Sequence, residues 1–153
     1  MTFRVGYLTP REVNIWDLRR RNNSQSDIGR QLGVSRQAVH KAYQIIDQKV
    51  EQAFMEAADT NHLEINTINL VEGVMMAYSP AYNIPVIVSL SKTNGLKIWY
   101  LYEGNCGSCH LEKSCRSILE AEAHERGILL NTVDSWISPT KLANEIFERY
   151  QDD

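Results

Sequence analysis

The twenty residues from Gln25 to Gln44 read QSDIGRQLGVSRQAVHKAYQ, and this stretch predicts two short helices joined by a tight turn. The spacing of its apolar residues places them on the inner side of such a motif. They are Ile28, Leu32, Val34, Val39 and Ala42. Gly29 is small at the point where two steeply crossed helices leave least room for a side chain. Gly33 supplies the left-handed backbone that a turn of this length needs. Each requirement is steric, and together they predict a helix-turn-helix.

Capping residues extend this prediction in both directions along the chain. Thr9-Pro10 opens a helix over about 10–21, with Val13, Trp16 and Leu18 as its apolar side. Ser24 and Asp27 cap a helix over about 25–32. Ser35 caps a third helix, which meets no glycine or proline before about Ala58.

The outward positions of the third helix suit contacts with DNA. They are Ser35, Arg36, Gln37, His40, Lys41 and Gln44. Arg36 matches the paired acceptors of guanine, and Gln37 matches the edge of adenine. Ser35 and Lys41 suit phosphates, as do Arg19, Arg20 and Arg21 at the end of the first helix. The alternative is that these are ordinary solvent-facing residues of an exposed helix.

Charge is divided unevenly along the 153 residues, although the net charge is only −3. Residues 1–54 contain nine Lys and Arg against five Asp and Glu, whereas residues 55–153 contain seven against fourteen. A basic segment attached to an acidic remainder is typical of a DNA-reading module joined to a part with another task.

The segments Leu8–Glu12 and Ser26–Val39 resemble the helix-turn-helix of the LuxR and sigma-region-four type. Within that group the chain is most similar to archaeal Tfx-like regulators, firmly over residues 7–55 and loosely over 60–103. The resemblance implies a sequence-specific transcriptional regulator that binds double-stranded DNA, commonly as a homodimer. It does not extend beyond Gly104.

An apolar stripe along the third helix has heptad spacing. It comprises Val39, Tyr43, Ile46, Val50, Ala53 and Ala57. We expect Ile46, Val50, Ala53 and Ala57 to pair with a second subunit, because one recognition helix reads only a half-site. The alternative is that the stripe packs against the chain's own sheet.

From His62 onward the hydrophobic period changes to that of strands. Runs over 63–69, 73–79, 86–90 and 96–102 predict an antiparallel sheet, with Asn94-Gly95 as a hairpin turn. Helices follow over about 114–126 and 139–150, with a final strand possible over 128–133. The predicted fold class is α+β, with a helical DNA-binding and dimerisation domain over 1–58 and an α+β effector domain over 60–153.

Three cysteines fall within ten residues, in Cys106-Gly-Ser-Cys109-His110 and at Cys115. A Cys-x2-Cys turn presents two thiolates to one metal, and Cys115 adds a third from the start of a helix. His110 is the nearest candidate for a fourth ligand. Zinc and an iron–sulfur cluster, the latter for redox sensing, are the two cofactors considered.

Free thiols are a further interpretation of this cluster. The run also matches the Cys-x-x-Cys-His signature of covalent haem, which requires export. The N-terminus shows no signal peptide and no stretch approaches a membrane span, so we expect a cytoplasmic protein without a membrane partner.

Aromatic and methionine residues crowd the predicted sheet and could line a pocket for a small-molecule effector. They are Met75, Met76, Tyr78, Tyr82, Trp99, Tyr100 and Tyr102. No catalytic grouping is evident, so we do not expect an enzyme. Two rival functions stay open: a metal- or cluster-dependent enzyme or electron carrier with an accessory helix-turn-helix, and a protein–protein adaptor.

Overall fold

The computed structural model describes residues 7–101, 109–130 and 137–151. Three helices come first: α1 (Pro10–Arg20), α2 (Gln25–Leu32) and α3 (Arg36–Thr60). Four strands follow: β1 (Glu64–Asn69), β2 (Val74–Ser79), β3 (Ile84–Ser91) and β4 (Gly95–Tyr100). The chain then forms α4 (Glu112–Glu125), α5 (Pro139–Phe147) and a 3₁₀ turn, η2 (Glu148–Tyr150). The predicted α+β class is confirmed.

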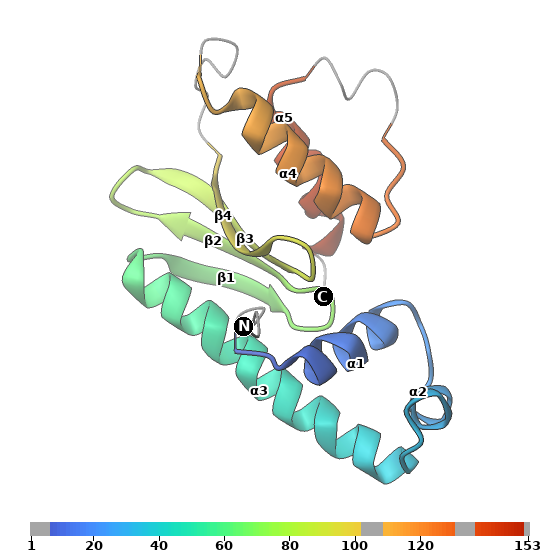
Figure 1. Ribbon diagram of the computed structural model, residues 1–153. Helices are drawn as coiled ribbons and strands as arrows, with labels where there is room; N and C mark the ends of the chain where they lie inside the picture. The colour runs from blue at the N-terminus through green and yellow to red at the C-terminus, as the bar shows by residue number, and fades with distance from the viewer. Residues whose placement is uncertain (1–6, 102–108, 131–136, 152–153) are drawn as a thin grey trace.

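The strands form one antiparallel meander in the order β1-β2-β3-β4. Its turns contain the left-handed residues Gly73, Asn83 and Gly95, and a register shift between Ile65 and Thr67 interrupts the β1–β2 ladder. Helices cover both faces, with α1 and α3 below the sheet and α4 and α5 above it in Figure 1. Cover on both sides explains why β2 and β3 are nearly continuous apolar runs rather than alternating ones.

Alternate residues of the central strands enter two separate cores. Met75 and Ala77 of β2 pack toward α1 and α3, whereas Val74 and Met76 pack toward α4 and α5. The first core runs without interruption from the helix-turn-helix into the sheet, across the boundary near residue 59 that the sequence predicts. The helical head and the sheet therefore share one hydrophobic core.

The indole of Trp16 fastens α1 to the sheet. Its Nε1–H donates to the carbonyl of Leu70 at 3.2 Å, and the side chain is fully buried. Gly73 lies directly against this ring, because a Cβ at position 73 would come within 2.7 Å of Trp16 Cζ2. The turn between β1 and β2 is thus shaped to receive α1.

The predicted final strand is wrong where the structure describes it. Residues 128–130 form no strand, and 131–133 lie outside the described residues. Gly127 adopts the left-handed conformation at the end of α4, and the Ile128 N–H donates back to the carbonyl of Ala123 at 2.8 Å. That bond closes the helix end, and Leu129 beside it is 96% exposed.

Candidate nucleic-acid interface

The helices α1, α2 and the first half of α3 form the trihelical head that the sequence predicts. Thr9 and Glu12 make a reciprocal capping box, Ser24 accepts from the Asp27 N–H, and Ser35 accepts from the Ala38 N–H. Ile28 and Val39 are buried between the helices. All three predicted helix starts are confirmed.

The close crossing of α2 and α3 depends on the two predicted glycines. A Cβ at Gly29 would meet the Val34 carbonyl oxygen at 2.7 Å, a distance at which backbone must move. Gly33 is left-handed at φ 68° and its N–H donates to Gly29 O. These two positions fix how α3 leaves the turn, and therefore which of its residues face outward.

The structure leaves every predicted outward residue of α3 exposed. These residues are Ser35, Arg36, Gln37, His40, Lys41 and Gln44. Gln25 of α2 reaches across to His40 Nδ1 at 3.1 Å, and these two border a shallow hollow of about 290 Å³ with Arg36 and Gln37. In Figure 1 this end of α3 projects from the bottom of the molecule, far from the sheet.

The three arginines at the end of α1 have three different environments. Arg21 has a side chain 60% exposed, although it pairs with Asp17 at 3.3 Å. Arg19 lies over the ring of Tyr43 and pairs with Asp47 at 2.8 Å. Arg21 is thus the more accessible of these two cations, and the charge of Arg19 is already paired.

The phosphate contact predicted for Arg20 is wrong, because the side chain of Arg20 is only 4% exposed. Its Nη2 lies 2.9 Å from carboxylates of both Asp17 and Glu125, and its guanidinium stacks over Trp16. A buried guanidinium cannot reach a phosphate without breaking these pairs. Arg20 therefore holds α1 against the end of α4, and its guanidinium is not exposed for a ligand.

The predicted dimerisation stripe is also wrong, because its residues are buried within the single chain. Ile46, Val50, Ala53 and Ala57 are between 1% and 7% exposed within the single chain. Ile46, Val50 and Ala57 belong to the core that α3 shares with α1 and the sheet, which is the alternative named above. An apolar stripe shows that a helix has a partner, and here the partner is the chain itself.

The cysteine cluster is described only in part. Cys106 lies outside the described residues, Cys109 and His110 are exposed just before α4, and Cys115 is half-buried in its first turn. Within the described ranges no three His, Cys, Asp or Glu side chains are grouped to hold a metal ion.

The aromatic and methionine residues of the sheet that the structure describes lie on both of its faces. Met75 and Tyr100 belong to the core under α3, whereas Met76 and Trp99 belong to the opposite core. Tyr82 is 69% exposed, and Tyr102 lies outside the described residues. Within the described part of the chain, the residues predicted to line an effector pocket are therefore divided between the two faces of the sheet, because neighbouring residues of a strand point to opposite faces.

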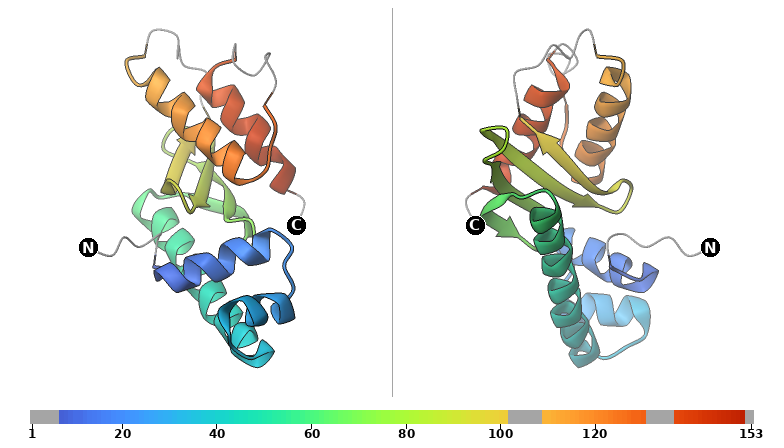
Figure 2. Two further views of the ribbon diagram at one scale, coloured as in Figure 1. Left: turned by 45° about the vertical axis from the view of Figure 1, so that its right-hand side comes forward. Right: turned by 90° about the vertical axis from the view of Figure 1, so that its left-hand side faces the viewer.

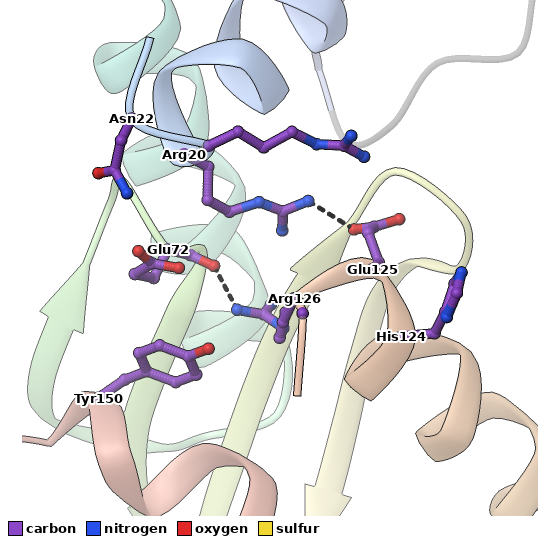
Figure 3. Close-up of a pocket in the computed structure, with 9 residues that line it drawn as sticks. Arg20, Asn22, Glu72, His124, Glu125, Arg126 and Tyr150 are labelled. Atoms are coloured by element: carbon purple, nitrogen blue, oxygen red, sulfur yellow. Dashed lines mark hydrogen bonds and ion pairs between the residues drawn. The ribbon is translucent and has the colours of Figure 1, made fainter. Parts of the chain in front are cut away.

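A buried polar network at the end of α4 has no counterpart in the sequence analysis. Arg126 pairs with Glu122 at 3.1 Å, both side chains being 0% exposed, and its guanidinium also donates to the carbonyls of Glu72, Gly73 and Leu90. Figure 3 shows Arg126 reaching Glu72 beside the Arg20–Glu125 pair, at an open hollow of about 570 Å³. Glu122 is only four residues from Arg126, but the carbonyl acceptors are 36 to 54 residues away in sequence, so no local pattern could have revealed that part of the network.

Glu125 gathers donors from two directions. Besides Arg20, the N–H groups of Lys92 and Thr93 donate to it at 2.9 and 2.7 Å. Burial would raise the pKa of this carboxyl, but the hydrogen bonds from Thr93, Lys92 and Arg20 outweigh burial and lower it. The charged form of Glu125 thus joins α4, the β3–β4 turn and α1.

Comparison with known proteins adds no relative: no family model, no curated protein and no solved structure matches this chain. In the part of the chain that the structure describes, no helix is both long and apolar enough to cross a membrane.

Proposed function

We propose that this chain is a DNA-binding transcriptional regulator that reads the major groove with the first turns of α3. The observation that carries the proposal is the exposure of all six polar residues that the motif directs outward, on the projecting end of a helix. An α-helix fits the major groove, and the N-terminal part of a recognition helix meets the base edges.

Individual side chains have distinct roles in this proposal. Arg36 and Gln37 lie in the first turn of α3, where they would face base edges. Arg21 lies at the end of α1, where it would contact a phosphate, and Lys41 lies one turn beyond Gln37, at the edge of the reading residues. The Ser35 hydroxyl already accepts the Ala38 N–H at 3.1 Å, which leaves its own proton for a phosphate oxygen.

The test is selection of binding sequences from a random duplex library, followed by titration at several salt concentrations. We expect log K to fall linearly with log[salt] for the wild type. Arg36→Ala should lose about 1–3 kcal/mol on the selected duplex and lose discrimination at one base position. Arg149→Ala is the matched control, because this exposed arginine lies on η2, outside the head.

Two results would remove the proposal. One is a wild-type protein with no salt-dependent affinity for any duplex, which would favour the adaptor. The other is Arg36→Ala binding the selected duplex as well as Arg149→Ala does, because the first turn of α3 would then not be the reading element.

We further propose that the cysteine cluster binds zinc or an iron–sulfur cluster that stabilises or senses. Support comes from the thiolate spacing and from the position of α4, which begins beside Cys109 and ends at the Glu125–Arg20 pair. A change at the cysteines would thus have a rigid path to α1. Stoichiometric zinc or iron in anaerobically purified protein, lost in Cys109→Ser, is expected; metal-free protein would remove this part.

A further inference from the structure

The side of α3 that faces away from the sheet carries a second regular stripe. This outer stripe is Lys41, Ile45, Gln48, Gln52, Met55 and Asp59, spaced 4, 3, 4, 3, 4, and all six residues are exposed. Ile45 is 40% and Met55 49% exposed, so two large apolar side chains are open to solvent on this face of α3. In the right view of Figure 2, α3 lies in front and no described element covers it.

The outer stripe is complementary to itself in one orientation only. If a second α3 lies antiparallel with the twofold axis at the level of residue 50, Ile45 meets Met55, Gln48 meets Gln52, and Lys41 meets Asp59. A parallel pair would instead place Lys41 against Lys41 and Asp59 against Asp59. We infer that a second copy of this chain packs antiparallel on the outer stripe, forming an isologous dimer.

This inference rests on the proposed function, and the distance between the two reading ends supports it. The first turns of α3 centre near residue 38, twelve residues from the proposed axis. At 1.5 Å per residue the two centres lie about 36 Å apart along the paired helices. Half-sites one turn of B-DNA apart are separated by a nearly equal distance, about 34–36 Å.

The direction of the reading face agrees with the same arrangement. At 100° per residue, Arg36, His40 and Gln44 form a row on one flank of the outer stripe. A twofold axis perpendicular to two antiparallel helices turns that flank of both copies toward the same side. One duplex could therefore meet both heads.

Opposite charges introduced at Ile45 and Met55 test both the surface and the register of the proposed dimer. Ile45→Glu and Met55→Lys each place a charge against an apolar partner, so each should weaken self-association at least tenfold in a sedimentation concentration series. The double variant places opposite charges across the twofold axis and should regain most of the wild-type association. Positions 45 and 55 are too far apart on one helix to rescue each other within a chain.

Leu129→Glu is the control, because Leu129 is the most exposed large apolar residue described and lies after α4. It should dimerise as the wild type does, and all variants should keep the wild-type circular dichroism. Single variants that sediment like the wild type, or a wild type that is monomeric throughout the series, would show that the outer stripe is not a dimer interface. Failure of the double variant to recover would overturn the antiparallel register.

DNA titration separates this inference from the proposed function. A wild type that binds its selected duplex as a monomer, with Ile45→Glu unaffected, would remove the dimer and leave the reading head. A dimer that responds to the variants as expected but binds no duplex would leave the interface and remove the DNA-binding function.

Discussion

The absence of a Cβ at Gly29 allows α2 to pack closely against the start of α3. Alanine is the best helix former, so Gly29→Ala would ordinarily stabilise α2 by about 1 kcal/mol. Here the new Cβ would lie 2.7 Å from a backbone oxygen, so we expect a net loss of about 1–3 kcal/mol in the free energy of unfolding. Urea denaturation measures it, with Gln31→Ala as the exposed control in the same helix. Equal stability of the two variants would contradict the steric role of Gly29.

Glu125 gives the molecule a pH-dependent contribution whose sign follows from its lowered pKa. The contribution is complete above the ordinary carboxyl value of 4.5 and is lost as pH falls through the lower folded value. Glu125→Gln should therefore be less stable than the wild type by about 2 kcal/mol at pH 7. The difference should shrink below pH 4.5, and thermal unfolding at several pH values measures it. A difference independent of pH would mean that the charge of Glu125 is not what joins α1 to α4.

At the scale of elements, α3 carries a buried stripe that packs in the core of the chain and an exposed outer stripe that we propose as the dimer surface. Ile46→Ala empties a position that is 1% exposed, so we expect a loss of about 2–5 kcal/mol in the free energy of unfolding. Leu129→Ala, at 96% exposure, should change it by less than about 0.5 kcal/mol. Denaturation at two protein concentrations checks that the loss is independent of self-association. A loss for Ile46→Ala that vanished on dilution would return this residue to the dimer interface.

Local rules predicted the helix starts and the turn because caps and glycines act within three or four residues. They did not decide what covers the predicted dimerisation stripe of α3 (Ile46, Val50, Ala53 and Ala57). An apolar stripe has the same sequence pattern whether it packs against a sheet or against a second subunit. The environment of Arg20 was equally hidden, since Glu125 is 105 residues away. The predicted strand at 128–133 is wrong at residues 128–130, because an apolar run forms a strand only where a neighbouring strand pairs with it.

At the scale of the whole molecule, the shared core predicts that the head does not fold alone. A fragment of residues 1–60 would lose the sheet half of the core to which Trp16, Phe54 and Ala57 belong in the full chain. We expect weak helicity in circular dichroism for this fragment and a single cooperative transition for the full chain. A fragment with native helicity and its own melting transition would restore the two-domain division near residue 59.

The unbroken α3 also limits how this protein can change in evolution. One helix carries both the reading residues at its start and the packing residues at its end, so their relative angle depends on the number of residues between them. A single inserted or deleted residue near position 45 would turn the reading face by about 100° relative to the sheet. Related chains should therefore diverge here by substitution while this interval keeps its length, and length variation should collect in the loops instead.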